Sequence, residues 1–139
     1  AIKTPKIYML DTGLMAYLTK WLTPDTLQRG AKSGQFLETF VVAEIIKSFY
    51  NQGIEPPLYY YRDTNQKEID VIIEQDGVVY PIEIKSTANP DKKMGSAFKT
   101  LKDQLPENEI NVGTGVIINQ YPKKIWLTTA LVALPITYL

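Results

Sequence analysis

Two acids and a lysine interrupt two neighbouring apolar runs of the sequence. Asp70 lies in the run 68–74, and Glu83 and Lys85 lie in the run 78–85. A carboxylate or an ammonium group among isoleucines and valines loses hydration unless it is ion-paired or binds a metal. Hard cations such as Mg²⁺ prefer carboxylate oxygens, and a nearby lysine stabilises negative charge that develops on a phosphate. The pattern therefore fits either a buried ion pair or a divalent-metal site.

The two apolar runs predict an antiparallel hairpin. Both are rich in β-branched residues, which favour strands, and the Gln-Asp-Gly segment 75–77 suits the turn between them. Residues two apart in a strand point to the same face. We therefore expect Glu83 and Lys85 side by side on one strand, with Asp70 on its neighbour and the intervening isoleucine pointing the other way.

A further acid, Glu38, lies in a helix that we predict over residues 34–50. Apolar residues recur there every three or four positions, at Leu37, Val41, Ile45 and Phe49. At about 100° per residue, Glu38 falls within this apolar stripe, whereas Glu44 falls at its edge. Glu38 is then either an ion-paired or partly exposed residue, or another member of the acidic site.

Composition limits the chemistry that is available. The chain has 139 residues, so we expect one domain over residues 1–139. It contains no histidine and no cysteine, which excludes histidine triads, cysteine-ligated zinc and disulfides. Basic and acidic residues balance at 15 each, so contact with nucleic acid must come from a local patch. No apolar run is long enough to cross a membrane and no signal peptide is visible, which favours a cytoplasmic protein.

The remaining elements are short strands and a second helix. Asn89 and Pro90 suit the N-cap and first turn of that helix, and its apolar stripe would be Met94, Phe98, Leu101 and Leu105. The other elements that we expect are a strand at 6–10, a helix at 13–19, and strands at 58–62, 113–118, 125–127 and 131–134.

Several basic residues are candidate nucleic-acid contacts. Lys92, Lys93 and Lys99 lie on one side of the second helix, directly after the acidic segment. Such a charge run is usually a solvated face, but here it could also follow a phosphate backbone. Arg62 ends the strand 58–62 and is either a phosphate contact or an ion-pair partner.

The order of helix with Glu38, strand, strand with Asp70, strand with Glu83-x-Lys85, helix and strand resembles the core of the PD-(D/E)XK nuclease superfamily, the restriction-endonuclease-like fold. The resemblance covers residues 34–118. It implies an α/β fold with a mixed sheet, flanked by a short N-terminal strand and helix and by short C-terminal strands.

The same resemblance implies a metal site. Asp70, Glu83 and the backbone carbonyl of Ile84 would bind Mg²⁺ or Mn²⁺, and Glu38 would hold a second ion or an outer-shell water. Lys85 would orient the attacking water or stabilise charge on the phosphate. The expected catalytic residues are therefore Asp70, Glu83 and Lys85.

A closer resemblance covers nearly the whole chain. The segments that carry it are 6–14, the Gly-x-x-x-Glu-x-x-Val-x-x-Glu pattern of 34–44, 61–62, 68–70, 82–86 and 133–136. They resemble an uncharacterised domain family found at the C-terminus of AAA-type ATPases, which implies that an ATPase module precedes Ala1 in a longer protein. The chain has no complete phosphate-binding loop of its own, so we expect no ATP hydrolysis by it alone.

Three functions fit these features. The first is a metal-dependent nuclease domain that hydrolyses phosphodiester bonds in DNA or RNA. The second is a nuclease-like scaffold that no longer cuts, and that binds a partner or regulates its ATPase. The third is a structural module that binds a metal without nucleic acid. Metal-induced stabilisation fits the first and third, and salt-dependent affinity for DNA separates them.

Overall fold

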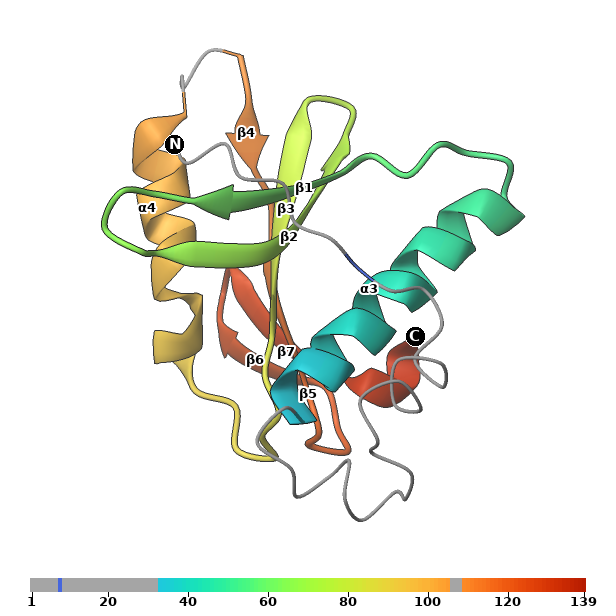
Figure 1. Cartoon of the computed structure of the whole chain (residues 1–139). Helices are drawn as coiled ribbons and strands as arrows, with labels where there is room; N and C mark the ends of the chain where they lie inside the picture. Colours follow the sequence, from blue (N-terminus) through green and yellow to red (C-terminus); the bar gives the residue numbers. More distant parts are fainter. Residues whose placement is uncertain (1–7, 9–32, 106–108) are drawn as a thin grey trace. The chain divides into compact units, whose positions relative to one another are not determined.

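The computed structural model describes residue 8, residues 33–105 and residues 109–139 (Figure 1). The chain divides into two compact units, one of which contains residues 57–138 and the other the described residues 8 and 33–56. The single domain expected over 1–139 stays a prediction. The strand expected at 6–10, Tyr8 excepted, and the helix expected at 13–19 lie outside the described residues.

Residues 57–138 contain a seven-stranded mixed sheet, with the strand order β1-β2-β3-β5-β7-β6 and with β4 beside β3. β1, β2 and β3 are antiparallel, β3, β5 and β7 are parallel, and β6 is antiparallel to β7. This mixed sheet confirms the expected α/β class. The strands are β1 (Leu58–Arg62), β2 (Glu68–Gln75), β3 (Val78–Ile84), β4 (Asn111–Val112), β5 (Gly115–Asn119), β6 (Ile125–Thr128) and β7 (Leu131–Pro135).

The hairpin between β2 and β3 is confirmed. Gln75 pairs with Val78 across a two-residue turn. Both turn residues have left-handed backbones, with φ of 53° at Asp76 and 77° at Gly77. This geometry matches a type I′ turn, whose twist suits a tight hairpin and for which Asp-Gly is a preferred sequence. The turn fixes the register that places the acidic residues of β2 and β3 near each other.

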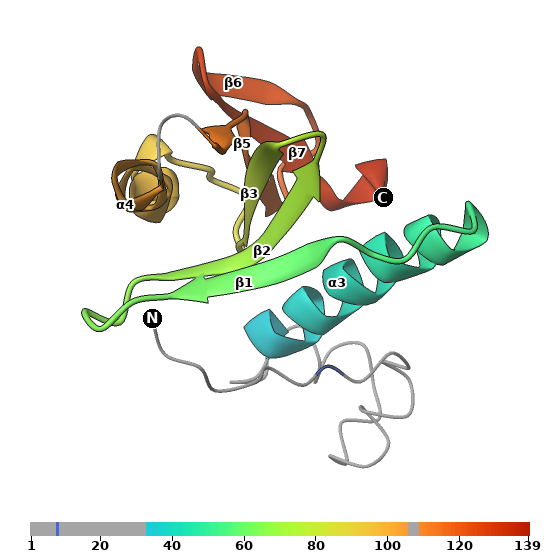
Figure 2. The ribbon, with the colours of Figure 1, turned by 90° about the horizontal axis from the view of Figure 1, so that it is seen from above.

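The parallel pair β3–β5 is joined by a helical crossover. It consists of the 3-10 helix η1 (Lys92–Gly95) and the helix α4 (Ser96–Gln104). Phe98 and Leu101 of α4 are buried in one cluster with Ile69, Val79 and Ile117 from the sheet. Figure 2 shows α4 along one side of the sheet. The expected apolar stripe of this helix is thus confirmed.

The start of the second helix differs from the prediction at Asn89 and Pro90. Asp91 is the N-cap instead, and its Oδ1 accepts a hydrogen bond from the Lys93 N–H at 2.8 Å. The Asn89 N–H donates to the Thr87 hydroxyl at 3.1 Å, which keeps this segment in the connection. A carboxylate is as good a cap as an amide, so the helical segment begins later.

The strand expected at 113–118 is also corrected, because it corresponds to β5, which begins two residues later, and a separate short strand, β4, precedes the expected range. Val79 pairs with Val112, but three residues later Ile82 pairs with Val116, so one extra residue lies in the β4–β5 segment. Pro81 faces this break, and it has no N–H to donate to a continuous strand. The sheet accommodates the proline by interrupting its partner strand.

The terminal strands and the first helix agree with expectation. The strands expected at 125–127 and 131–134 form the antiparallel pair β6–β7, and the 3-10 helix η2 (Ile136–Tyr138) follows. In the other unit, α3 (Ser33–Asn51) contains the expected helix. Gly53, with φ of 71°, follows its C-terminus, as a left-handed glycine often does. Neither described helix is long and apolar enough to cross a membrane.

Candidate functional site

A β-bulge lies at the position of Asp70. Tyr59 of β1 pairs with Ile72 of β2. Two residues further along β1, Tyr61 pairs with Ile69, so β2 has one extra residue between the two pairs. Ile69 and Ile72 accordingly join the same buried cluster, although a regular strand would point them to opposite faces. Bulges re-aim side chains next to functional sites, and this one turns Asp70 out of the regular alternation.

The Asp70 carboxylate takes the place of a main-chain carbonyl as the hydrogen-bond acceptor for the end of β3. The β2–β3 pairing extends as far as Val71 and Ile82. Beyond that pair, the Ile84 N–H donates to Asp70 Oδ2 at 2.8 Å. An extended residue directs its N–H and its C=O to the same edge of the strand, so the Ile84 carbonyl faces the side on which Asp70 lies. This places a carboxylate and a carbonyl at one end of the hairpin.

Glu83 is more deeply buried than Asp70 and Glu38, the other acids of the expected site. It is 5% exposed. Its Oε2 lies 3.4 Å from the Lys85 ammonium, whose side chain is 43% exposed. Its Oε1 is buried without a hydrogen-bond partner among the described residues. Burial, followed by the charge of Asp70, raises the pKa of Glu83 to about 7, although Lys85 acts in the opposite direction. Only one of the two oxygens of the ionised Glu83 carboxylate therefore has a partner among the described residues.

The raised pKa of Glu83 makes the metal-free protein less stable as the pH rises. Its folded pKa of about 7 exceeds the ordinary value of 4.5, so the folded chain binds more protons than the unfolded chain between these limits. The free energy of unfolding therefore falls from about pH 4.5 to about pH 7, by on the order of 2–3 kcal/mol at about 1.4 kcal/mol per pKa unit.

Urea unfolding in EDTA across this pH range measures the effect. The Glu83→Gln variant lacks the titrating group, so its curve of unfolding free energy against pH is expected to be flatter than that of the wild type. Parallel curves for the two proteins would show that Glu83 has an ordinary pKa.

The residues present fit a small divalent cation with few protein ligands. Asp70 and Glu83 supply carboxylate oxygens, and Ile84 supplies a carbonyl, which are the ligand types that Mg²⁺ and Mn²⁺ accept. The orphaned Oε1 of Glu83 gives an oxygen that gains a partner when a cation binds. Within the described part of the chain, no group of three or more His, Cys, Asp or Glu side chains is arranged to hold a metal. A metal here would keep several water ligands, as Mg²⁺ commonly does.

Glu38 and Glu44 both lie on α3, in the unit that contains residues 33–56. Glu38 is half-buried, and its Oε1 accepts a hydrogen bond from the Tyr8 hydroxyl at 2.9 Å. Glu44 is paired with Lys47 at 3.4 Å, as suits a residue at the edge of the stripe. The role of Glu38 as a second metal ligand stays a prediction.

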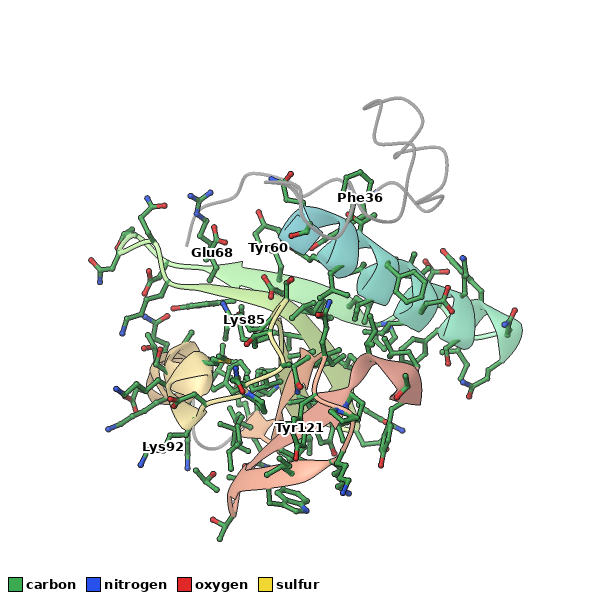
Figure 3. All side chains as sticks on the ribbon, turned by 90° about the horizontal axis from the view of Figure 1, so that it is seen from below. Phe36, Tyr60, Glu68, Lys85, Lys92 and Tyr121 are labelled. Atoms are coloured by element: carbon green, nitrogen blue, oxygen red, sulfur yellow. The ribbon has the colours of Figure 1, made fainter. Side chains whose placement is uncertain are left out.

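A pocket of about 400 Å³ opens beside Glu83 and Lys85. Of the candidate nucleic-acid contacts, only Lys93 lines it. Lys92 and Lys99 are exposed elsewhere on the helical segment, and Figure 3 shows Lys92 on the side turned away from Lys85. Arg62 is ion-paired, with its Nε 3.0 Å from Glu68 Oε1. Contacts of these residues with nucleic acid stay predictions.

Sequence reasoning missed two features of this site. One is Lys67, which lines the pocket from the loop between β1 and β2. Its position three residues before Asp70, where a hairpin returns toward the acidic strand, was the available signal. The other is the bulge in β2, for which the alternation of residues 68–74 gives no clear sign because both faces of the strand are apolar.

Comparison with known proteins gives a family but no activity. A family described as a domain of unknown function, DUF4143, matches residues 33–139. Uncharacterized protein Rv2008c of Mycobacterium tuberculosis and uncharacterized protein Mb2031c of Mycobacterium bovis are each 34% identical to the chain over 102 residues. The match covers 72% of the chain and 22% of each relative, so the chain spans about a fifth of their length.

Proposed function

The chain belongs to the DUF4143 family, and we propose that in this chain the domain is a metal-dependent nuclease module that hydrolyses phosphodiester bonds. The observation that carries the proposal is the buried, half-satisfied carboxylate of Glu83 beside Asp70 and Lys85. A purely structural ion pair gains nothing from leaving a buried carboxylate oxygen without a partner, and such clusters are often replaced by apolar residues without loss of stability.

The finer fold assignment is part of the proposal. A PD-(D/E)XK core places an aspartate on a hairpin, a Glu-x-Lys pair on the neighbouring strand, and a helix that leads to a parallel strand. The order β2, β3, α4 and β5 supports this assignment, since Asp70 lies on β2, Glu83 lies on β3 with Lys85 directly after it, and β5 is parallel to β3.

In this proposal Asp70, Glu83 and the Ile84 carbonyl hold Mg²⁺ or Mn²⁺. When bound, the ion would lower the pKa of a water that it binds and would neutralise charge on the phosphate. Lys85 is half-exposed at the mouth of the pocket, with its ammonium group near the buried acid. That position suits a group that orients a water or donates to a phosphate oxygen on which charge builds. Asp70 also holds the end of β3 through the Ile84 N–H.

A functional test should use the full-length protein. We propose that an ATPase module of AAA type accompanies the domain, in line with the small share of the relatives that the match covers. A second candidate function is a silent nuclease-like module that docks onto this ATPase. The balance of 15 basic and 15 acidic residues favours it, because it gives the domain no general attraction to nucleic acid.

Cleavage assays separate the two functions. Full-length wild type, Glu83→Gln and Glu74→Gln would be incubated with labelled single-stranded and duplex DNA and RNA, in Mn²⁺ or in EDTA. Glu74 is an exposed acid on the same hairpin and serves as the matched control. We expect Mn²⁺-dependent cleavage by wild type and Glu74→Gln and none by Glu83→Gln. Equal rates for all three, or no cleavage of any substrate, would favour the silent module.

A further inference from the structure

We propose that Lys67 and Lys93 bind phosphate groups of a polynucleotide strand in the pocket beside Glu83 and Lys85. The identity of the ligand rests on the proposed function. The choice of the two lysines rests on the pocket itself, because both line it and they come from different elements. Lys67 comes from the loop before β2, and Lys93 comes from η1.

The pocket has walls from three elements. Lys67 and Glu68 form the wall at the start of β2, Glu83 and Lys85 line it from the end of β3, and η1 with the first turn of α4 closes it. Its volume of about 400 Å³ falls in the lower part of the range for small-ligand sites. The pocket is therefore large enough for a phosphate and its sugar but not for the cross-section of a duplex.

The acids that line the pocket already have partners. Glu68 is paired with Arg62 at 3.0 Å, and Glu83 is paired with Lys85 at 3.4 Å. The third acid, Asp91, accepts a hydrogen bond from the Lys93 main chain in its role as helix cap. Each acidic side chain of the pocket thus has at least one partner within the fold, and the one buried oxygen among them that has no partner in the described part of the chain is Oε1 of Glu83.

The two lysines, in contrast, have no ion pair within 4 Å in the described part of the chain. The Lys67 ammonium donates to the neutral Thr100 hydroxyl at 3.1 Å, and Lys93 is exposed. Arg62 and Lys85 balance Glu68 and Glu83, so Lys67 and Lys93 together with Asp91 leave one positive charge in excess at the pocket. A phosphodiester strand supplies the anionic groups that would complement them.

Both lysines extend from fixed backbone. The Lys67 N–H donates to Asp63 Oδ1 at 2.9 Å, and Asp63 is itself buried. The Lys93 N–H is held by Asp91 at 2.8 Å. Because these main-chain positions are set before a ligand arrives, less conformational freedom is lost on binding than for lysines on a loose loop.

The chain offers a matched control for each lysine. Lys102 is an exposed lysine of α4, and Lys123 is an exposed lysine between β5 and β6, and neither lines the pocket. Fluorescence anisotropy of a labelled 20-nucleotide single strand, and of the same sequence as a duplex, would be measured on the full-length protein in EDTA at several KCl concentrations. EDTA suppresses metal-dependent cleavage, so the readout is binding alone.

We expect Lys67→Gln and Lys93→Gln each to weaken binding several-fold and to reduce the slope of log affinity against log salt by about 0.7–0.9. Lys102→Gln and Lys123→Gln should leave the slope unchanged. The single strand is expected to bind more tightly than the duplex. The proposal is overturned if wild type binds neither probe, or if the pocket lysines behave like their controls. Pocket-dependent binding without cleavage in Mn²⁺ would support this inference and reject the nuclease.

Discussion

The Lys85→Ala variant of the full-length protein is expected to lose phosphodiester cleavage by a factor of about 10² to 10³. Removal of one group that stabilises transition-state charge typically costs this much. The Lys85 side chain is 43% exposed and lies outside the buried cluster, so the fold should persist, but the free energy of unfolding should fall at neutral pH because the buried Glu83 carboxylate loses its charged partner. Rates of substrate cleavage, with urea unfolding as a check on folding, provide the measurement.

Loss of Lys85 also changes the pKa of Glu83, and this indirect effect must be separated from a direct role of Lys85 in cleavage. Lys85 lowers the pKa of Glu83, so its removal raises that pKa above about 7 and protonates a metal ligand at neutral pH. Raising the pH of the assay shifts Glu83 back toward the ionised carboxylate. A direct role predicts that the Lys85→Ala defect persists as the pH rises, whereas an indirect role predicts recovery. Cleavage by Lys85→Ala at the rate of wild type and of the Lys123→Ala control would contradict both roles.

The second large effect concerns the helix that closes the pocket. A Cβ atom at Gly115 would lie 2.5 Å from the ring of Phe98, which is buried against the sheet. Gly115→Ala should therefore destabilise the fold by about 1–3 kcal/mol through overpacking. Phe98→Ala should cost about 3–5 kcal/mol because it leaves a cavity.

The two changes should compensate when combined. The double variant Gly115→Ala with Phe98→Ala removes the clash, so its loss of stability should be well below the sum of the single losses, with a coupling of about 1–2 kcal/mol. Urea unfolding of the four proteins gives the coupling. Gly34→Ala is the control, since no atom lies within 4 Å of its added Cβ. Strict additivity would mean that Gly115 and Phe98 do not pack as described.

Local patterns in the sequence were sufficient to predict the hairpin that carries the site. The Asp-Gly turn and the two β-branched runs define the register through neighbouring residues alone, so Asp70, Glu83 and Lys85 were correctly placed near one another. The stripe of α4 was equally predictable, because Phe98 and Leu101 follow a helical period.

Features that depend on distant parts of the chain were not predictable in this way. The split between β4 and β5 depends on Pro81, which lies in another strand and cannot donate a hydrogen bond there. The bulge at Asp70 depends on pairing with β1. The contribution of Lys67 to the pocket depends on how a loop packs beside α4. Each of these follows from tertiary pairing rather than from a local period.

Metal binding is the central claim of this account, and calorimetry with Mn²⁺ tests it most directly. Asp70→Asn is the informative variant, because its amide oxygen still accepts the hydrogen bond from Ile84 while the charge of the ligand is lost. With both proteins shown to be folded by thermal melts, we predict Mn²⁺ binding by wild type and a loss of at least about tenfold in affinity for Asp70→Asn. Equal affinities, or no binding by wild type, would contradict the account and leave Asp70, Glu83 and Lys85 as a buried ion-pair cluster.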